Sequence, residues 1–414
     1  MALPDAEVVH LVTADTSAAR ADALATLLAR PDVAVRQRVV HLGTGAARIS
    51  DGVRSIRVHT PFGLSWLGAR AMRRELEECR PVGGQCVILH AWSATAARWC
   101  IPLVSDDRRL LVDVDADPEL SRVALWPTSG RLQDIPTYVC PTLRVREGLL
   151  SLGVPAERCV LIRPGVDAGV LNPDRRADIR AQLQLDEHDV VVTALPPLAR
   201  HTGTFTVAWA VLLVEKVRPD VRLVVPAGGR EQQRVRRLVE SCQHERVARY
   251  ADQRLALPDL LAASDVAAYL PNGPASTDSL AWAMAAGCPL VASAVSTTTE
   301  LLTHGENAWL CRPNDPEEAA RALLQVIEHP AESRERAERA RAQAASEFGR
   351  ERMVEQYRRC YEALTTGDES LISRPLAHGR GSEHDAMSFR QDIALAPEPV
   401  SSHTMDIHCK DPRP

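Results

Sequence analysis

Short apolar runs alternate with amphipathic segments through the first half of this chain. Apolar runs bounded by turn residues predict strands, and the segments with a helical repeat between them predict helices. The expected strands are Val8–Val12, Val35–His41, Cys86–His90, Leu110–Val114, Thr137–Cys140 and Cys159–Arg163. The expected helices are Ala18–Leu28, Leu64–Cys79 and Arg144–Leu152. Such alternation predicts β/α units on a parallel sheet.

The second half repeats this pattern. Its expected strands are Val190–Leu195, Arg222–Pro226, Val247–Tyr250, Val266–Leu270, Pro289–Ser293 and Ala308–Cys311. Its expected helices are Thr206–Val217, Glu231–Cys242, Leu257–Ala263, Thr277–Ala286, Thr297–Thr303 and Pro316–Glu328. Between the halves, the stretch Gly165–Pro173 breaks any regular period. Two α/β domains are therefore expected, with a boundary there.

The C-terminal part differs from both halves. Glu332–Ala345 and Arg350–Leu364 are expected helices rich in Arg and Glu. From Thr365 onward the chain is rich in Ser, Pro, Gly, His and charge, with Phe389 as its one aromatic residue. Such a segment buries too little apolar surface to fold alone. We expect domains at 1–166 and 167–349, a final helix at 350–364 and a disordered tail at 365–414.

Composition narrows the class of protein. A length of 414 residues fits two domains better than one. A net charge of −5 and 4% aromatic residues give no footprint for nucleic-acid binding. No apolar run reaches the roughly 20 residues of a membrane span, and no signal peptide is evident at the start. The ten cysteines form no C-x-x-C pair, so we expect no metal site, reduced thiols and a cytoplasmic location.

Several enzyme classes are disfavoured by missing motifs. The first strand is not followed by G-x-G-x-x-G, which disfavours a dinucleotide-dependent oxidoreductase. The sequence also lacks the G-x-x-x-x-G-K-[ST] loop of nucleotide triphosphatases and the G-x-S-x-G turn of serine hydrolases. We expect no bound cofactor.

The segment Pro274–Val291 carries the most information about family. It reads as a turn, a short helix, a Gly–Cys–Pro break and a buried strand. It resembles the donor-site signature of the glycosyltransferase family 4 (group 1) enzymes, E-G-F-G-x-x-x-x-E-A-M-A-x-G-x-P-V-V-A. The positions that fit are Ala283, Met284, Ala285, Gly287, Pro289, Val291 and Ala292.

Other segments extend the resemblance over about residues 137–364, and more weakly over 8–115. The segment 159–167 followed by Pro173 resembles the family's interdomain entry, and Ala262–Pro271 resembles A-A-A-D-V-F-V-L-P-S. Four further residues fit a later motif, namely Glu300, Gly305, Asn307 and Asp315.

The resemblance implies an α/β fold of the GT-B type, with two facing Rossmann-like domains and a cleft between them. It implies a nucleotide-diphosphate sugar as donor on the C-terminal domain, an acceptor on the N-terminal domain and a last helix that crosses back. It also implies retaining transfer to a glycan or lipid acceptor.

The charged positions of the family's donor site are replaced in this chain. The family's two glutamates fall on Pro274 and Trp282, and its Arg and Lys fall on Pro197 and Thr202. The candidate donor-binding residues are then Arg200, His201, Gly203, Thr277, Ser279 and Glu300. The alternatives are that Arg200 is a solvated residue at a helix entry and that Ser276, Thr277 and Asp278 cap a helix.

Candidates on the acceptor side are His90 and Asp115. His90 ends an expected strand in V-I-L-H-A-W-S. Asp115 alternates with Asp113 and Asp117, so the three carboxylates share one face of an extended segment. They could supply a base or a metal site, or they are solvated loop residues.

Two hypotheses of function follow. In the first, the chain is a working glycosyltransferase with a rebuilt donor site that uses Arg200 and Arg163. In the second, it is a non-catalytic member that binds a sugar, a glycan or a protein partner. The joint replacement of four charged positions favours loss of ordinary catalysis.

Overall fold

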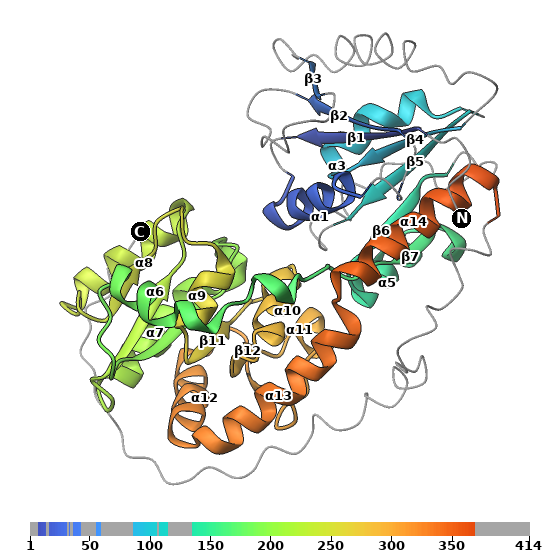
Figure 1. Cartoon of the computed structure of the whole chain (residues 1–414). Coiled ribbons are helices and arrows are strands. Elements are labelled where there is room, and N and C mark those ends of the chain that lie inside the picture. Colours follow the sequence, from blue (N-terminus) through green and yellow to red (C-terminus); the bar gives the residue numbers. More distant parts are fainter. Residues whose placement is uncertain are drawn as a thin grey trace.

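The protein consists of two α/β units, each built on a parallel sheet (Figure 1). The computed structural model describes residues 7–13, 16–30, 33, 36–42, 55–58, 86–105, 107–114 and 135–368. The strand order is β3-β2-β1-β4-β5-β6-β7 in the first sheet and β10-β9-β8-β11-β12-β13 in the second. This arrangement confirms the α/β class expected from the alternating pattern.

The first unit surrounds the seven-stranded sheet. Its strands are β1 Glu7–Thr13, β2 Arg36–Leu42, β3 Ser55–Val58, β4 Val87–Ala91, β5 Arg108–Asp113, β6 Thr137–Cys140 and β7 Cys159–Leu161. Its helices include α1 Ala18–Leu28, α3 Ala94–Cys100 and α5 Leu143–Ser151. Consecutive residues of β1, such as Val8 and Val9, are fully buried. Burial on both faces is typical of a parallel sheet covered by helices on each side.

The second unit surrounds the six-stranded sheet. Its strands are β8 Val190–Ala194, β9 Val221–Val225, β10 Ala248–Tyr250, β11 Val266–Tyr269, β12 Leu290–Ser293 and β13 Trp309–Cys311. Its helices are α6 Arg176–Gln182, α7 Thr204–Glu215, α8 Gly229–Ser241, α9 Leu257–Ala263, α10 Asp278–Ala285, α11 Ser296–Thr299, α12 Pro316–Glu328 and α13 Pro330–Glu347. α7 carries almost only apolar side chains because it lies between the sheet and its neighbours α8 and α12.

The expected elements within the described residues are present, with some changes of extent. The helix expected over Thr297–Thr303 is only the short α11. β3, α3 and α6 were not expected; α3 lacks an amphipathic repeat because most of its residues are buried. The expected helix Leu64–Cys79 lies outside the described residues.

The chain passes between the two units at two adjacent segments. Val166 pairs with Gly349: the Val166 N–H donates to the Phe348 carbonyl (2.7 Å), and the Arg350 N–H donates to the Val166 carbonyl (3.3 Å). Gly165 lies so close to α14, Arg350–Thr366, that a Cβ there would stand 2.8 Å from the Met353 sulfur. The two connections therefore form one packed strip.

Helix α14 belongs by packing to the first unit, although it follows the second along the chain (Figure 1). Its apolar face shares a core with β1 and β4. The helix residues in that core are Met353, Val354, Tyr357, Cys360, Tyr361 and Leu364. α14 ends at Thr366, and the expected tail lies outside the described residues from 369 onward.

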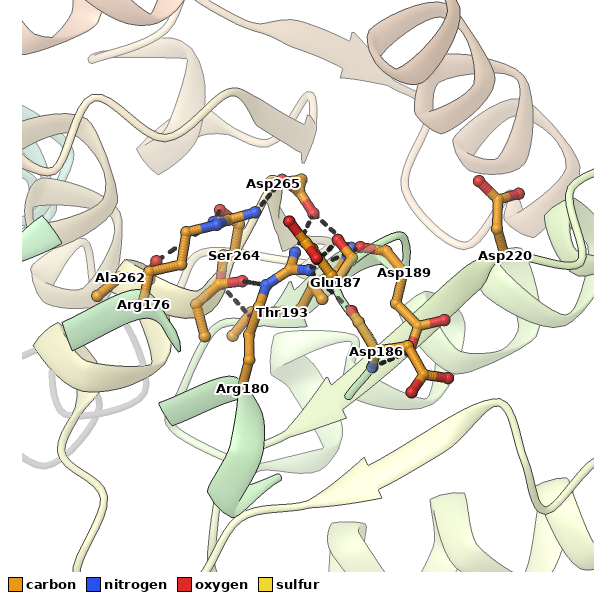
Figure 2. Close-up of polar contacts among 12 residues, drawn as sticks. Arg176, Arg180, Asp186, Glu187, Asp189, Thr193, Asp220, Ala262, Ser264 and Asp265 are labelled. Atoms are coloured by element: carbon orange, nitrogen blue, oxygen red, sulfur yellow. Dashed lines mark hydrogen bonds and ion pairs between the residues drawn. The ribbon is translucent and has the colours of Figure 1, made fainter. Parts of the chain in front are cut away.

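A buried arginine ties the amino-terminal ends of β8 and β11 to α6 (Figure 2). Arg180 donates to the Asp265 carboxylate (2.7 Å) and to four backbone carbonyls, those of Asp186, Glu187, Asp189 and Ala263. The same carboxylate accepts the N–H of Val191 at 2.8 Å. Burial lowers the pKa of Arg180, and Asp265 counteracts that effect. The network lies at the edge opposite to the one where ligands of parallel sheets bind, so its role is structural.

Candidate functional site

The carboxyl ends of β8 and β11 lie side by side at the centre of the second sheet. Ligands of open α/β sheets bind beyond this edge. The loop after β8 contains the turn Arg200–Thr202, and the loop after β11 leads into α10. Most of the candidate donor-binding residues are in these two loops.

The side chain of Thr202 forms hydrogen bonds within its own turn. Its side chain is buried, and its hydroxyl lies 2.6 Å from the Pro197 carbonyl and 2.7 Å from the Ala199 carbonyl. The same oxygen accepts the N–H of Ala199 at 3.2 Å. With its donor and one acceptor site used, this hydroxyl stabilises the turn and offers no cation to a phosphate.

Gly203 is retained for a structural reason. Its φ is +74°, a left-handed conformation that favours glycine. A Cβ built there would stand 1.7 Å from the Leu270 carbonyl oxygen at the end of β11. Beside it, the Asn272 N–H donates to the His201 carbonyl at 3.0 Å. Gly203 therefore allows the two loops to pack against each other.

Replacing Gly203 with alanine is expected to separate these loops. The added carbon collides with backbone, which cannot rotate away, and the left-handed conformation alone costs about 1–2 kcal/mol. Thermal unfolding should show a marked drop in the midpoint, whereas Gly305→Ala should cost less because the space around its Cβ is open despite a φ of +82°. Equal midpoints for the two variants would contradict this account of the loop contact.

Arg200 and His201 are the accessible cationic candidates. Both side chains are exposed, and neither forms a hydrogen bond or an ion pair with another described residue. Their exposure permits contact with an anion at this edge and equally fits the alternative of solvated residues at a helix entry. The neighbouring helix α10 carries a single charged residue, Asp278.

The start of α10 is polar and uncharged apart from Asp278. Thr277 and Ser279 are buried, and their hydroxyls have no hydrogen-bond partner within the described part of the chain. Thr277 occupies the N-cap position without capping, so that expectation was wrong for its side chain. Instead the Ser276 hydroxyl bonds the Asp278 carboxylate, and it accepts the Asp278 N–H at 3.4 Å. A carboxylate therefore stands where a pyrophosphate would meet the helix dipole.

Pro274 and Trp282, at which the sequence analysis expected the family's two glutamates, both lie half-buried in the structure. Trp282 is half-buried and packs on the core formed by α10, α13 and β12. Pro274 is half-buried in the turn before α10. Neither residue can accept the hydroxyl hydrogen bonds that a sugar or ribose would donate.

Glu300, the remaining acidic candidate, points to the first unit. Its carboxylate accepts the N–H groups of Leu143 (2.9 Å) and Arg144 (3.3 Å) at the start of α5. It also lies 2.8 Å from the Arg163 guanidinium. Glu300 and Arg163, which the sequence offered as donor-binding groups, are thus paired with each other.

On the first sheet, His90 lies in a buried polar cluster beneath α14. Its Nε2 is 2.7 Å from the Asp113 carboxylate, and its Nδ1 is 2.8 Å from the Tyr361 hydroxyl. Tyr357 donates to the other oxygen of Asp113 at 2.7 Å. Both ring nitrogens of His90 therefore have a hydrogen-bonding partner inside the cluster. His90 is fully buried, so it holds α14 and does not face an open acceptor site.

A second histidine extends this cluster. The Trp92 indole N–H donates to His10 Nδ1 (3.1 Å), and His10 Nε2 is 3.0 Å from the Gln37 amide oxygen. Burial, with a smaller contribution from the neighbouring His90, lowers the pKa of His10 to about 3. The ring is therefore neutral at physiological pH.

Sequence analysis did not predict the hydrogen-bonding partners of His90. Asp113 was noted only as one of three alternating carboxylates, and the two tyrosines come from a helix more than 240 residues away. The available signal was the spacing of Tyr357 and Tyr361, which lie four residues apart and so share one face of the helix. Asp115 lies outside the described residues. Within the described ranges, no group of three His, Cys, Asp or Glu side chains could hold a metal ion.

Comparison with known proteins agrees with the family resemblance. Residues 175–344 match the family model described as glycosyl transferases group 1. The chain is 31% identical over 211 residues to a GDP-mannose-dependent α-(1-6)-phosphatidylinositol dimannoside mannosyltransferase of Mycobacterium tuberculosis, covering 50% of this chain and 53% of that protein. It is 26% identical over 151 residues to the N-acetyl-α-D-glucosaminyl L-malate synthase of Bacillus anthracis, covering 36% and 40%. The chain thus spans about half the length of the curated relatives it matches.

Solved structures support the fold more broadly. Anabaena HepE in complex with UDP and glucose superposes with a TM-score of 0.70 at 20% identity, covering 84% of this chain and 97% of HepE. Sucrose-phosphate synthase of Thermosynechococcus elongatus gives 0.70 at 17% identity, covering 88% and 100%. The expected GT-B architecture is confirmed. No helix among the described residues has the length and apolar character needed to cross a bilayer.

Proposed function

Since the chain belongs, through residues 175–344, to the group 1 glycosyltransferase family, we propose that it is a GT-B protein that has lost ordinary sugar transfer and acts by binding a glycan or a protein partner. The proposal rests on the replacement of charged residues at the expected donor site. Pro197, Thr202, Pro274 and Trp282 stand at four charged family positions, and Thr202 and Trp282 have structural roles there.

The charges that remain nearby do not replace the lost ones. Transfer from a nucleotide-diphosphate sugar requires stabilisation of the leaving pyrophosphate by cations and backbone N–H groups. Glu300 and Arg163 neutralise each other, and Asp278 opposes an anion at the start of α10. Arg200 and His201 are accessible and have no hydrogen-bond or ion-pair partner at this edge, within the described residues.

A second candidate function rests on those two side chains. A rebuilt donor site could use Arg200 and His201 to hold a diphosphate and retain transfer to a glycan or lipid acceptor. The relatives named above are sugar transferases, which favours this alternative. It requires measurable binding of a nucleotide sugar, whereas the binding-only function does not.

Thermal unfolding in the presence of nucleotide sugars separates the two functions. A ligand at about 100 times its Kd stabilises the folded state by about 2.7 kcal/mol. We expect UDP-, GDP- and ADP-sugars at millimolar concentration to leave the midpoint unchanged. An upward shift with one of them, lost in Arg200→Ala, would favour the rebuilt donor site.

We further propose that the protein acts in the cytoplasm. Eight of its cysteines lie in the described residues, and none of these eight is in a disulfide. Most of them are buried among apolar side chains, where a thiol behaves as a small hydrophobe. Free thiols fit a reducing compartment.

A further inference from the structure

Glu300 joins the two units at the N-terminus of α5. The first N–H groups of any α-helix lack partners within the helix. In α5, the N–H of Val145 is capped by the Thr142 hydroxyl at 3.2 Å, within the first unit. The N–H groups of Leu143 and Arg144 are capped instead by the carboxylate of Glu300, which follows α11 in the second unit. The second unit therefore caps the N-terminus of a helix of the first unit.

Arg163 strengthens the same contact from the end of β7. Its guanidinium lies 2.8 Å from Glu300 and 3.3 Å from the Glu347 carboxylate at the end of α13. Its charge also lies 6.0 Å from the centre of the Phe348 ring. The side chains of Arg163 and Glu300 are only 11% and 9% exposed. A charge pair with this little solvent contact is screened far less than a surface pair.

The contact stands beside the point where the chain crosses between units. Val166 and Gly349 pair at that crossing, and Arg350 bonds Asp167 there at 2.7 Å. A hinge rotation of one unit relative to the other would have its axis near this crossing. Glu300 reaches α5 from outside the connections, so such a rotation has to break its hydrogen bonds.

We propose that Glu300, Arg163 and the N-terminus of α5 form a latch that fixes the two units in one relative orientation. It makes the unliganded protein a rigid two-unit scaffold, and release of Glu300 is the step that lets the units move apart. This inference concerns domain motion and does not depend on the loss of sugar transfer.

The test compares Glu300→Ala with wild type by hydrogen exchange and small-angle X-ray scattering on the full chain. Losing hydrogen bonds to a charged acceptor should speed exchange of the Leu143 and Arg144 amides by about ten- to hundredfold. The scattering curve should at the same time show a broader distance distribution and a larger maximum dimension. Glu300→Gln, which keeps the side-chain size, should give smaller changes in the same direction and serves if the alanine variant unfolds.

Glu317→Gln is the matched control. Glu317 is 75% exposed on α12 and pairs only with Arg321, at 3.5 Å, among the described residues. It should leave both measurements unchanged. Faster exchange at α5 without a change in scattering would overturn the latch and leave a local helix cap. Unchanged exchange in both Glu300 variants, or equal changes in the control, would also overturn it.

Discussion

Replacing Arg180 with methionine should lower the free energy of unfolding by about 3 kcal/mol. Each buried carbonyl left without a donor costs about 1–3 kcal/mol, and the Asp265 carboxylate loses a partner. The side chain of Arg180 is 8% exposed, while Asp265 is 34% exposed, so solvent will compensate the carboxylate in part. Denaturant titration followed by circular dichroism measures the change.

Arg176 provides the matched control for this prediction. It bonds the same carboxylate at 2.5 Å and two carbonyls of the same loop, but its side chain is 40% exposed. Since water can replace an exposed partner, Arg176→Met should cost about 1 kcal/mol or less. If both variants lose the same stability, the buried network is not what secures this edge of the sheet.

Acidification from pH 7 to pH 5 should destabilise the first unit through His10. The folded state holds the pKa of His10 at about 3, whereas the ordinary value is 6.5, so the unfolded chain binds the proton first. The contribution of neutral His10 to the stability of the folded state is therefore present above about pH 6.5 and is lost as the pH falls toward 3. At pH 5, the free energy of unfolding should be about 2 kcal/mol lower than at pH 7, using about 1.4 kcal/mol per pH unit.

Unfolding titrations at pH 7, 6 and 5 measure this dependence. Protonation of Nδ1 would break the bond from the Trp92 indole, so the loss belongs to His10 specifically. Glutamine at position 10 offers an acceptor to Trp92 and a donor to Gln37 without titrating. The His10→Gln variant should lose about 2 kcal/mol less than wild type over this range. A parallel pH profile for the two proteins would assign the acid sensitivity elsewhere.

Much of the fold follows from local sequence. Most expected strands in the described residues are apolar runs, because a strand covered on both faces is apolar on both sides. The strand that begins with Arg36, Gln37 and Arg38 departs from this pattern at its first, less buried residues. Helices such as α12 have one buried face, so their repeat is visible in the sequence. The short α3 and α6 were missed: α3 is mostly buried, and α6 follows closely after the irregular stretch Gly165–Pro173.

The candidate sites could be predicted only in part, because their residues meet across long stretches of chain. The lack of a carboxylate at Pro274 and Trp282 is visible in the sequence alone. The pairing of Glu300 with α5 joins positions 157 residues apart, and Tyr361 reaches His90 across 271 residues. No local pattern encodes such contacts. Gly203 was a candidate donor-binding residue in the sequence, and only the structure shows that its Cα faces the Leu270 carbonyl.

Calorimetric titration of the wild-type protein with UDP-, GDP- and ADP-sugars tests the central claim most directly. Loss of two charged hydrogen-bonding groups should weaken donor binding by roughly 10²- to 10⁴-fold. We predict no saturable binding in the micromolar range, and none after Pro274→Glu and Trp282→Glu are introduced together. Micromolar binding of any of these sugars to the wild type, abolished by Arg200→Ala, would contradict the claim and establish a rebuilt donor site.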